Sequence, residues 1–380
     1  MKKTQRKTCH VAFVMMLTLV FSCFAGCEKA EEISFVSRKE EAKKVDGTLK
    51  KILIVHSYHQ GLGWNEDTER GVVEGLKMSG YVLDKDYQMK KFYMDTKITY
   101  VTPQQIKERA DKAIKLIEEF KPDLVIVNDD NALKYVAVTY AMENPQRKLP
   151  FLFTGINCDP TIYEPVESLE NPGHYITGAL ERFPYYQSFS LARKIFPDKK
   201  RVFLMGDSSP SADFIVQAFK KRYLGTVKDS PLEVVAVVQV KTFKEWKEKI
   251  KEYQDKADFL GIITYYQLLD EHDRFVHAWE VLSWTINHNR LPELGFLLFH
   301  SEDGFWMSVG VSPLKTGRYV GKIAGDILDG KDPGAIPVVD PRCVDIAFNL
   351  ERSNMLGIKI PVDILNMATV TYKEIKRPRF

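Results

Sequence analysis

The chain has 380 residues. A single hydrophobic core rarely stabilises a chain of this length, so the length predicts two domains. Its 54 Lys and Arg residues nearly balance its 51 Asp and Glu residues, and the net charge of +3 is small. Because the charges of both signs are interspersed, the sequence does not indicate a nucleic-acid-binding protein, and we expect no nucleic-acid partner.

The first 26 residues have the pattern of an export signal. A basic stretch at 2–7 precedes an apolar run at 11–21, which is too short to span a bilayer comfortably. Small residues follow and end at Cys27. We therefore predict a signal peptide at 1–26 and a protein that works outside the cytoplasm.

Cys27 closes the sequence FAGC, which resembles a bacterial lipobox with Phe24 at the position where Leu is usual. In lipoproteins the signal peptide is cut before this cysteine and lipid is attached to its thiol. The segment 27–49 is rich in Glu, Lys and Ser and has no apolar period, so we predict a flexible tether. The alternatives are a cut after Ala25 that releases a soluble secreted protein, and an uncleaved N-terminal anchor.

Two cysteines, Cys158 and Cys343, belong to the body of the chain. Nothing in the local sequence places them near each other, so we expect two free, partly buried thiols rather than a disulfide. A location outside the cytoplasm also argues against chemistry with ATP, NAD or a reducing thiol. No cofactor is predicted.

Short apolar runs alternate with helical patterns from residue 50 to about residue 180. The first helix is predicted from Glu66 to Met78, with Asn65 as its N-cap. Thr102 and Gln105 give a capping-box pattern at the start of the second helix. The predicted strands of this half are 51–56, 88–95, 123–128, 150–155 and 174–180, and the predicted helices are 66–78, 103–120 and 131–142.

The same alternation begins again near residue 201. Ser209 and Pro210 start a helix that is predicted to end at Phe219. Thr242 and Glu245 give a second capping-box pattern. The predicted strands of this half are 201–206, 232–240, 258–264 and 294–299, with a long helix containing Trp279 and Trp284 before the last strand.

Strands as uniformly apolar as these are typical of parallel sheets that helices cover on both faces. Two consecutive α/β halves therefore predict two doubly wound parallel-sheet lobes. A further helical segment at 314–330 and an extended segment within 337–361 can complete each sheet in turn. The chain would then cross between the lobes more than once, through a hinge of several strands.

A series of segments along this layout carries a specific resemblance. They are HSYHQGLGW, TERGVVEGL, VNDDNALKY, LPFLFTGIN, YITGALE, FLMGDSSPSADF, TGRYVGKIAGDILDGKDPGAIPV and FNLERSNMLGIKIP. In this order, over residues 50–366, the chain resembles the ABC transporter substrate-binding protein family, which has the periplasmic binding protein type I fold.

The resemblance implies two lobes, joined by three crossing strands, that close on a small molecule and deliver it to a membrane permease with its ATPase. The implied N-terminal lobe is 50–180 with 305–332, and the C-terminal lobe is 181–304 with 333–380. We expect a monomer that a lipid anchor holds at the bacterial membrane. HSYH with a nearby Trp also occurs in extracellular sensor modules, so the alternative is a ligand sensor that signals through a partner membrane protein.

One turn departs from the family pattern. The amino-acid-binding branch often has a short Thr-Pro-x-Ala type turn after its third strand, whereas this chain has the acidic turn Asn128–Asn131. This departure argues against simply transferring an α-amino-acid ligand from that branch.

Ligands of open parallel sheets sit beyond the carboxyl ends of the strands, where turn side chains and helix N-termini converge. An aromatic face there can stack on a flat ligand, and a carboxylate can hold an amine or a sugar hydroxyl. The candidate ligand-binding residues that this rule selects are Ser57, Tyr58, Trp64, Asp129, Asp130, Asn131, Asn157, Glu181, Asp207, Ser208, Ser209, Tyr265, Tyr266 and His300.

Several of these candidates also have a structural interpretation. Trp64 can pack over the helix start, and Asp130 can cap a helix. Ser209 is favoured as a cap, although the backbone N–H groups around it can still bind an anionic group. Tyr265 and Tyr266 would point to opposite faces if their strand continues, so only one of them would line a ligand site.

Metal binding and catalysis are both weakly indicated. His56 and His59 lie three residues apart, but no third ligand is signalled, and His56 is expected to be hydrogen-bonded inside the first lobe. The sequence contains neither a G-x-S-x-G nucleophile elbow nor a complete G-x-x-x-x-G-K-[ST] phosphate loop. Glu181 and Asp207 are carboxylates of the kind that glycosidases pair, but sequence gives no separation between them. We therefore predict a solute-binding protein without a metal and without enzyme activity.

Overall fold

The computed structural model describes residues 49–97 and 99–376. The predicted signal peptide, the lipidated Cys27 and all but the last residue of the tether lie outside these residues. Within the described part, no helix is both long enough and apolar enough to cross a membrane.

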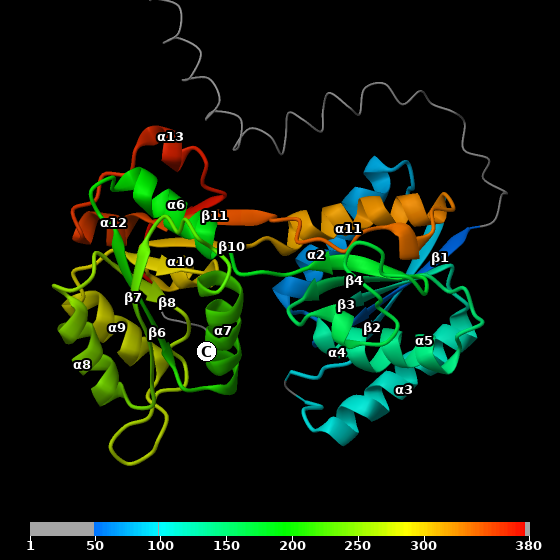
Figure 1. The fold of residues 1–380 in the computed structure, drawn as a ribbon, viewed down its shortest axis with the longest axis horizontal. Helices are drawn as coiled ribbons and strands as arrows, with labels where there is room; N and C mark the ends of the chain where they lie inside the picture. The colour runs from blue at the N-terminus through cyan, green and yellow to red at the C-terminus, as the bar shows by residue number, and fades with distance from the viewer. Residues whose placement is uncertain (1–48, 98, 377–380) are drawn as a thin grey trace, which may run out of the picture. The chain divides into compact units, whose positions relative to one another are not determined.

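The first sheet is fully parallel, with strand order β2-β1-β3-β4-β5 (Figure 1). Its strands are largely buried because helices cover both faces, as the uniformly apolar sequence predicts, except for the edge strand β2, in which Lys90 and Lys91 are exposed. The strands are β1 Lys50–His56, β2 Tyr87–Tyr93, β3 Leu124–Asn128, β4 Phe151–Ile156 and β5 Ile176–Leu180; the helices that follow them in the chain are α2 Gly63–Met78, α3 Pro103–Phe120, α4 Asp130–Ala132, η1 Leu133–Val138, α5 Thr139–Glu143 and η2 Pro160–Ile162.

The second sheet has the order β12-β11-β10-β9-β8-β6-β7 and is parallel except for the antiparallel pair β10–β11. Its strands are β6 Arg201–Asp207, β7 Glu233–Val240, β8 Phe259–Ile262, β9 Glu293–Gly295, β10 Met307–Val311, β11 Val344–Asn349 and β12 Val370–Tyr372. Its helices are α6 Tyr185–Ile195, α7 Pro210–Phe219, η3 Lys220–Leu224, α8 Phe243–Tyr253, α9 Ala278–His288, α10 Phe299–Asp303, α12 Leu350–Met355 and α13 Val362–Leu365. We call the residues built around the first and second sheets the first and second lobes.

The chain passes between the two sheets three times in the described residues. It leaves β5 for α6 through residues 181–184, returns from β10 to α11, and leaves again from η4 to β11. Helix α11 spans Pro313–Leu328 and η4 spans Pro333–Ala335. The predicted multi-strand hinge is therefore confirmed.

Helix α11 packs against α2 on the first sheet (Figure 1). Glycines allow the two helix backbones to approach closely: a Cβ at Gly71 would lie 2.2 Å from Leu314 O, and one at Gly317 would lie 2.4 Å from Thr68 O. Because real Cβ atoms do not come this near to a backbone oxygen, these two positions require glycine. The contact fastens the returning chain to the first lobe.

Two predicted element boundaries are wrong by three or more residues. Helix α2 begins at Gly63 rather than Glu66, and Asn65 is not its N-cap but a buried first-turn residue whose amide donates to His59 O at 2.9 Å. The predicted strand 294–299 ends at Gly295, and Phe299 already begins α10. An apolar run alone does not separate a buried strand from a buried helical turn.

The predicted division of the chain at residue 305 also needs correction. β10 pairs with β9 and β11 in the second sheet, so the returning segment joins the first sheet only at α11. By contrast, the capping boxes at Thr102 and Thr242 are confirmed, as are the start and end of α7.

Candidate functional site

The carboxyl ends of β3, β4 and β5 bring three carboxylates of the first lobe together. Asp129 and Asp130 follow β3, and Glu181 follows β5. Asp129 has φ 71° and ψ 164°, a backbone conformation that residues other than glycine rarely adopt. Backbone strain of this kind is found where a chain must direct a side chain precisely.

Asp129 is 3% exposed, and in the described part of the protein its Oδ2 has no hydrogen-bond partner. Burial raises the pKa of Asp129 well above its usual range, and the nearby charges of Glu181 and Asp130 raise it further. The positive charge of Lys97 lowers the pKa of Asp129 and partly offsets this rise. A buried carboxyl without a partner favours a ligand that brings a positive charge or a donor.

Glu181 is 9% exposed and shares this environment. Burial raises the pKa of its carboxyl to about 8, and the Asp130 charge contributes to the same shift. The amide of Asn157 donates to Glu181 Oε2 at 3.5 Å and partly offsets the shift. At neutral pH the Glu181 carboxyl is therefore mostly protonated, whereas a bound cation would stabilise its ionised form.

Tyr58 and Trp64 supply aromatic surface beside the carboxylates. The charge of Asp129 is the main cause that raises the pKa of the Tyr58 hydroxyl, followed by burial. The Trp64 indole lies near enough to lower the pKa of Asp129, but no hydrogen bond of good geometry joins its Nε1 to the carboxylate. Lys97 Nζ lies over the Tyr58 ring, 4.9 Å from the centroid. Aromatic faces next to anionic groups suit a cationic ligand.

Three other predicted residues of the first lobe hold the turn in place. Ser57 Oγ donates to Asn128 O at 2.9 Å and accepts from the Ala132 backbone N–H at 2.8 Å, which ties the residue after β1 to the end of β3 and to α4. The Asp130 carboxylate accepts from the backbone N–H groups of residues 157 and 158, at 3.3 and 3.0 Å. Asn131 donates its amide to Thr96 Oγ1 at 2.9 Å. These side chains are positioned by the fold and in turn support Asp129.

Asp207 organises the corresponding turn of the second lobe. It is fully buried, and its carboxylate accepts from the backbone N–H groups of Ser209, Tyr266 and Gln267 at 3.0 to 3.1 Å. Ser209 caps α7 through the Ala212 N–H, as expected. Ser208 between them is exposed.

The condition under which Tyr265 and Tyr266 would point to opposite faces, a strand that continues through them, is not met. Both hydroxyl groups donate to Asp303 Oδ2, at 2.5 and 3.0 Å, because β8 ends at Ile262 and the alternation of a strand no longer applies. Tyr266 is half-buried, whereas Tyr265 has no exposed surface. His300 is also fully buried, and burial lowers its pKa to about 3, so its ring is neutral.

His56 is hydrogen-bonded inside the first lobe, as predicted. Its Nδ1 lies 3.1 Å from Asn128 Nδ2, and its Nε2 lies 2.9 Å from Glu69 Oε1. In the described part of the chain, no group of three or more His, Cys, Asp and Glu side chains is arranged to hold a metal ion. Cys158 and Cys343 are partly buried and form no disulfide with each other, as expected.

A cavity of about 480 Å³ lies where the crossing residues meet α6 and α7. Two predicted residues, Asn157 and Glu181, line it, but three arginines that the sequence interpretation missed also line it: Arg182, Arg222 and Arg342. Arg182 follows Glu181 directly at the first crossing, and this proximity was an available signal. Arg222 follows α7 within a helical segment that otherwise looks like an ordinary solvated surface.

A family model described as ABC transporter substrate binding protein matches residues 59–372. The chain belongs to this family. Substrate-binding proteins of ABC transporters capture small molecules and are not enzymes, so the family prediction and the absence of enzyme activity are both confirmed.

Known relatives are distant but match nearly the whole body. A tyrosine-binding protein of Clostridioides difficile (strain R20291) is 22% identical over 351 residues, covering 92% of each chain. The ligand-free, open structure of a substrate-binding protein with adhesive properties from Clostridium difficile has a TM-score of 0.63 at 20% identity, covering 86% of this chain and all of the other. A domain from Streptococcus pneumonia in complex with L-Trp has a TM-score of 0.56 at 20% identity, and the match covers 85% of this chain and 100% of the other. The type I periplasmic binding protein fold is thus confirmed.

Proposed function

We propose that this substrate-binding protein captures a small organic solute with a protonated amine and delivers it to an ABC importer. The observation that carries the proposal is the pair of buried carboxyl groups of Asp129 and Glu181, whose pKa values burial raises. An ammonium group between them would supply the missing positive charge, and both carboxyls would then ionise.

The aromatic surfaces support an amine with a flat body. Tyr58 and Trp64 adjoin the carboxylates and give such a body a stacking surface. Two relatives point in the same direction, because one is named for tyrosine and another was solved with L-Trp. Aromatic amino acids and aromatic amines are therefore the first solutes to test, even though the acidic turn Asn128–Asn131 departs from the usual amino-acid-binding pattern.

The three crossings between the sheets support a mechanism of hinge closure. A solute that contacts both lobes gains more contacts in the closed state, so its binding shifts the population toward that state. The candidates Asp207, Ser208, Ser209, Tyr265, Tyr266 and His300 would act from the second lobe, where Ser208 and Tyr266 have the more accessible side chains.

We further propose that the protein acts outside the cytoplasm as a monomer, anchored by lipid on Cys27. The basic and apolar pattern before FAGC supports this proposal. Metabolic labelling with a fatty-acid analogue tests it: the wild type should take up label and partition into membranes, and Cys27→Ala should do neither. Equal labelling of both proteins would contradict the anchor.

The proposed ligand class is tested by mass spectrometry and calorimetry on the purified protein. Denaturation should release an amine-bearing compound, and titration with L-tyrosine, L-tryptophan and tyramine should give saturable binding for at least one of them. Arabinose serves as a neutral comparison. Saturable binding of the sugar with no response to any amine would overturn the proposal.

A further inference from the structure

The cavity at the crossing residues has a feature that an amine site does not explain. Arg182 comes from the first crossing, Arg222 from the segment after α7, and Arg342 from the third crossing, yet all three line one space of about 480 Å³. The aromatic candidates Tyr58 and Trp64 of the amine site do not line it. The cavity therefore shares Glu181 with the carboxylate cluster but adds three positive charges that the cluster does not have.

Two of the guanidinium groups converge on one atom. Arg182 Nη1 and Arg222 Nη1 both donate to Asn157 O, at 3.2 and 2.8 Å. Arg182 also donates to the carbonyl oxygens of Ile156 and Cys158, so most of its donors are used by the backbone. Burial lowers the pKa of Arg182 to about 10, and the positive charge of Arg222 contributes to this shift. An anion close to this pair would relieve the repulsion.

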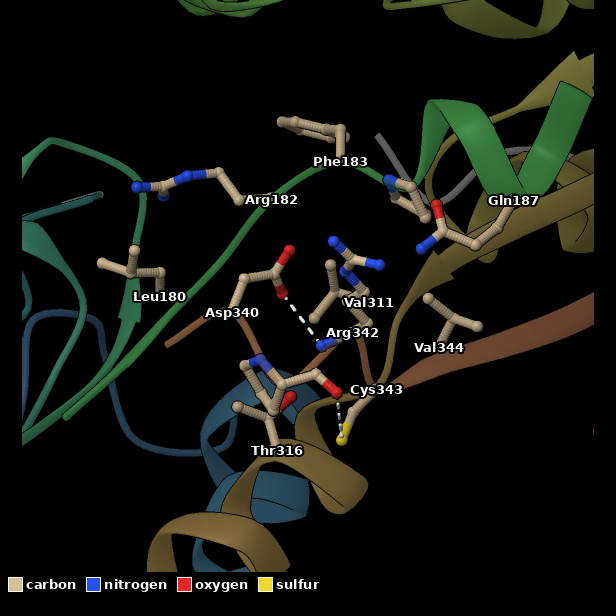
Figure 2. Close-up of a pocket in the computed structure, with 12 residues that line it drawn as sticks. Leu180, Arg182, Phe183, Gln187, Val311, Thr316, Asp340, Arg342, Cys343 and Val344 are labelled. Carbon is tan, nitrogen blue, oxygen red and sulfur yellow. Dashed lines mark hydrogen bonds between the residues drawn. The ribbon is translucent and has the colours of Figure 1, made fainter. Parts of the chain in front are cut away.

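Arg342 comes from the third crossing, between η4 and β11. Figure 2 shows its side chain between Asp340 and Gln187 beside a smaller cavity of about 30 Å³, while the Arg182 guanidinium points away from it. No hydrogen bond of the Arg342 guanidinium is found within the described residues, and the residue is exposed. Arg342 also has φ 49°, the left-handed conformation. Its guanidinium therefore has donors to offer to a ligand.

The charges that line the cavity add up in favour of an anion. Glu181 and Asp340 are the carboxylates in the lining, and burial raises the pKa of both, that of Glu181 to about 8. At neutral pH the Glu181 carboxyl is mostly neutral, so three guanidinium groups face a single ionised carboxylate. Arginine is the side chain best suited to bind a carboxylate with two parallel hydrogen bonds.

The rest of the lining is largely aromatic. Tyr186 and Phe214 line the cavity with 49% and 48% of their surface exposed, on α6 and α7 respectively. Exposed aromatic side chains on the wall of a cavity favour a ligand with a flat apolar body. A simple inorganic anion would leave this surface uncovered.

We propose that this cavity binds a carboxylate on a flat apolar body, with Arg222 and Arg342 as the groups that contact the carboxylate. Arg182 holds the strand end and contributes its charge. The carboxylate has two possible sources: a separate organic acid, or the acidic end of the transported solute. Glu181 belongs to both sites, so the cavity adjoins the proposed amine site, but the three arginines line the cavity whether or not an amine is bound.

The test is calorimetry on the full protein at pH 7. The probe is 3-phenylpropionate, and its uncharged amide is the neutral comparison compound. The acid should bind at least about tenfold more tightly than the amide, because charge-assisted hydrogen bonds exceed neutral ones. Arg222→Met should remove this preference. Arg342→Met changes an exposed residue, so it should weaken the binding of the acid about tenfold and leave the melting temperature unchanged. Arg70→Met is the matched control, because Arg70 pairs with Asp67 on exposed surface of α2.

A competition arm distinguishes the two sources. If saturating phenethylamine leaves acid binding unchanged, the site takes a separate organic acid; if the amine displaces the acid, the carboxylate belongs to the transported solute. Both results support the arginine site. Undetectable binding of the acid, equal binding of acid and amide, or wild-type affinity in Arg222→Met and Arg342→Met would each overturn it.

Discussion

The ammonium of Lys97 lies over the ring of Tyr58, with Nζ 4.9 Å from the ring centroid, and its charge lowers the pKa of the nearby Asp129 carboxyl. Lys97 is thus the cation that the fold itself places beside the proposed amine site. A cationic ligand would compete with it for the same aromatic face and the same carboxylate.

Replacing Lys97 by Met should strengthen the binding of aromatic amines such as tyramine by roughly fivefold, because the ligand no longer competes with an internal ammonium. Calorimetry at constant ionic strength measures the change. Lys107→Met, at an exposed position of α3, is the control and should leave the affinity unchanged. Weaker amine binding in Lys97→Met would show that Lys97 assists the ligand instead.

Amine binding should become tighter as the pH rises from about 6 to about 8. The free protein holds a proton on Glu181, whose pKa burial raises to about 8, and a bound ammonium lowers that pKa, so binding releases a proton. The affinity should rise by up to about tenfold per pH unit for one proton and level off above pH 8. Glu181→Gln should flatten this profile. A pH-independent affinity in the wild type would contradict the assignment.

The same group predicts how stability depends on pH. The folded protein binds a proton at Glu181 between the ordinary pKa of 4.5 and about 8, and the unfolded chain does not. The free energy of unfolding should therefore fall as the pH rises through this window. Thermal melts from pH 5 to pH 9 should show a smaller decline for Glu181→Gln than for the wild type. Glu248→Gln, an exposed control on α8, should behave like the wild type.

The contact between α2 and α11 should tolerate no side chain at its closest points. Gly317→Ala places a Cβ 2.4 Å from Thr68 O, so the helices must separate, at a cost of about 1–3 kcal/mol in the free energy of unfolding. Chemical denaturation measures this loss. Gly330→Ala is a poor control because its φ is 97°, whereas Gly63→Ala meets no atom within 4 Å and should cost far less.

The fold was predictable to a large extent because its signals are local. Capping boxes at Thr102 and Thr242, the Ser209–Pro210 helix start and the apolar strands gave elements that the structure confirms. The exceptions lie where tertiary contacts decide. The apolar run 294–299 turns into α10 after Gly295, and β10 joins the second sheet because it pairs with β9 and β11.

The candidate site was predictable only in part. The strand-end rule located Asp129 and Glu181 because carboxyl ends of parallel strands meet at one edge. It did not reveal that the Asp130 carboxylate accepts hydrogen bonds from two backbone N–H groups. Nor did it reveal that the hydroxyls of Tyr265 and Tyr266 both donate to Asp303. Arg222 and Arg342 escaped notice because the residues that line their cavity come from segments far apart in the chain.

These contacts also decide which variant is informative. Asp130→Ala would release the backbone N–H groups of residues 157 and 158, so a loss of binding could reflect a displaced turn. Asp129→Asn keeps the shape of a side chain whose Oδ2 has no hydrogen-bond partner in the described part of the protein, and the amide cannot ionise when a cation binds.

Calorimetric titration of wild type and Asp129→Asn with L-tyrosine, L-tryptophan and tyramine is the most direct test of the proposed amine site. We expect the substitution to lower the affinity for the amine that the wild type binds best by about tenfold or more, because a charge-assisted contact is lost. The melting temperature should not change. Equal affinity of the two proteins for that amine would contradict the account.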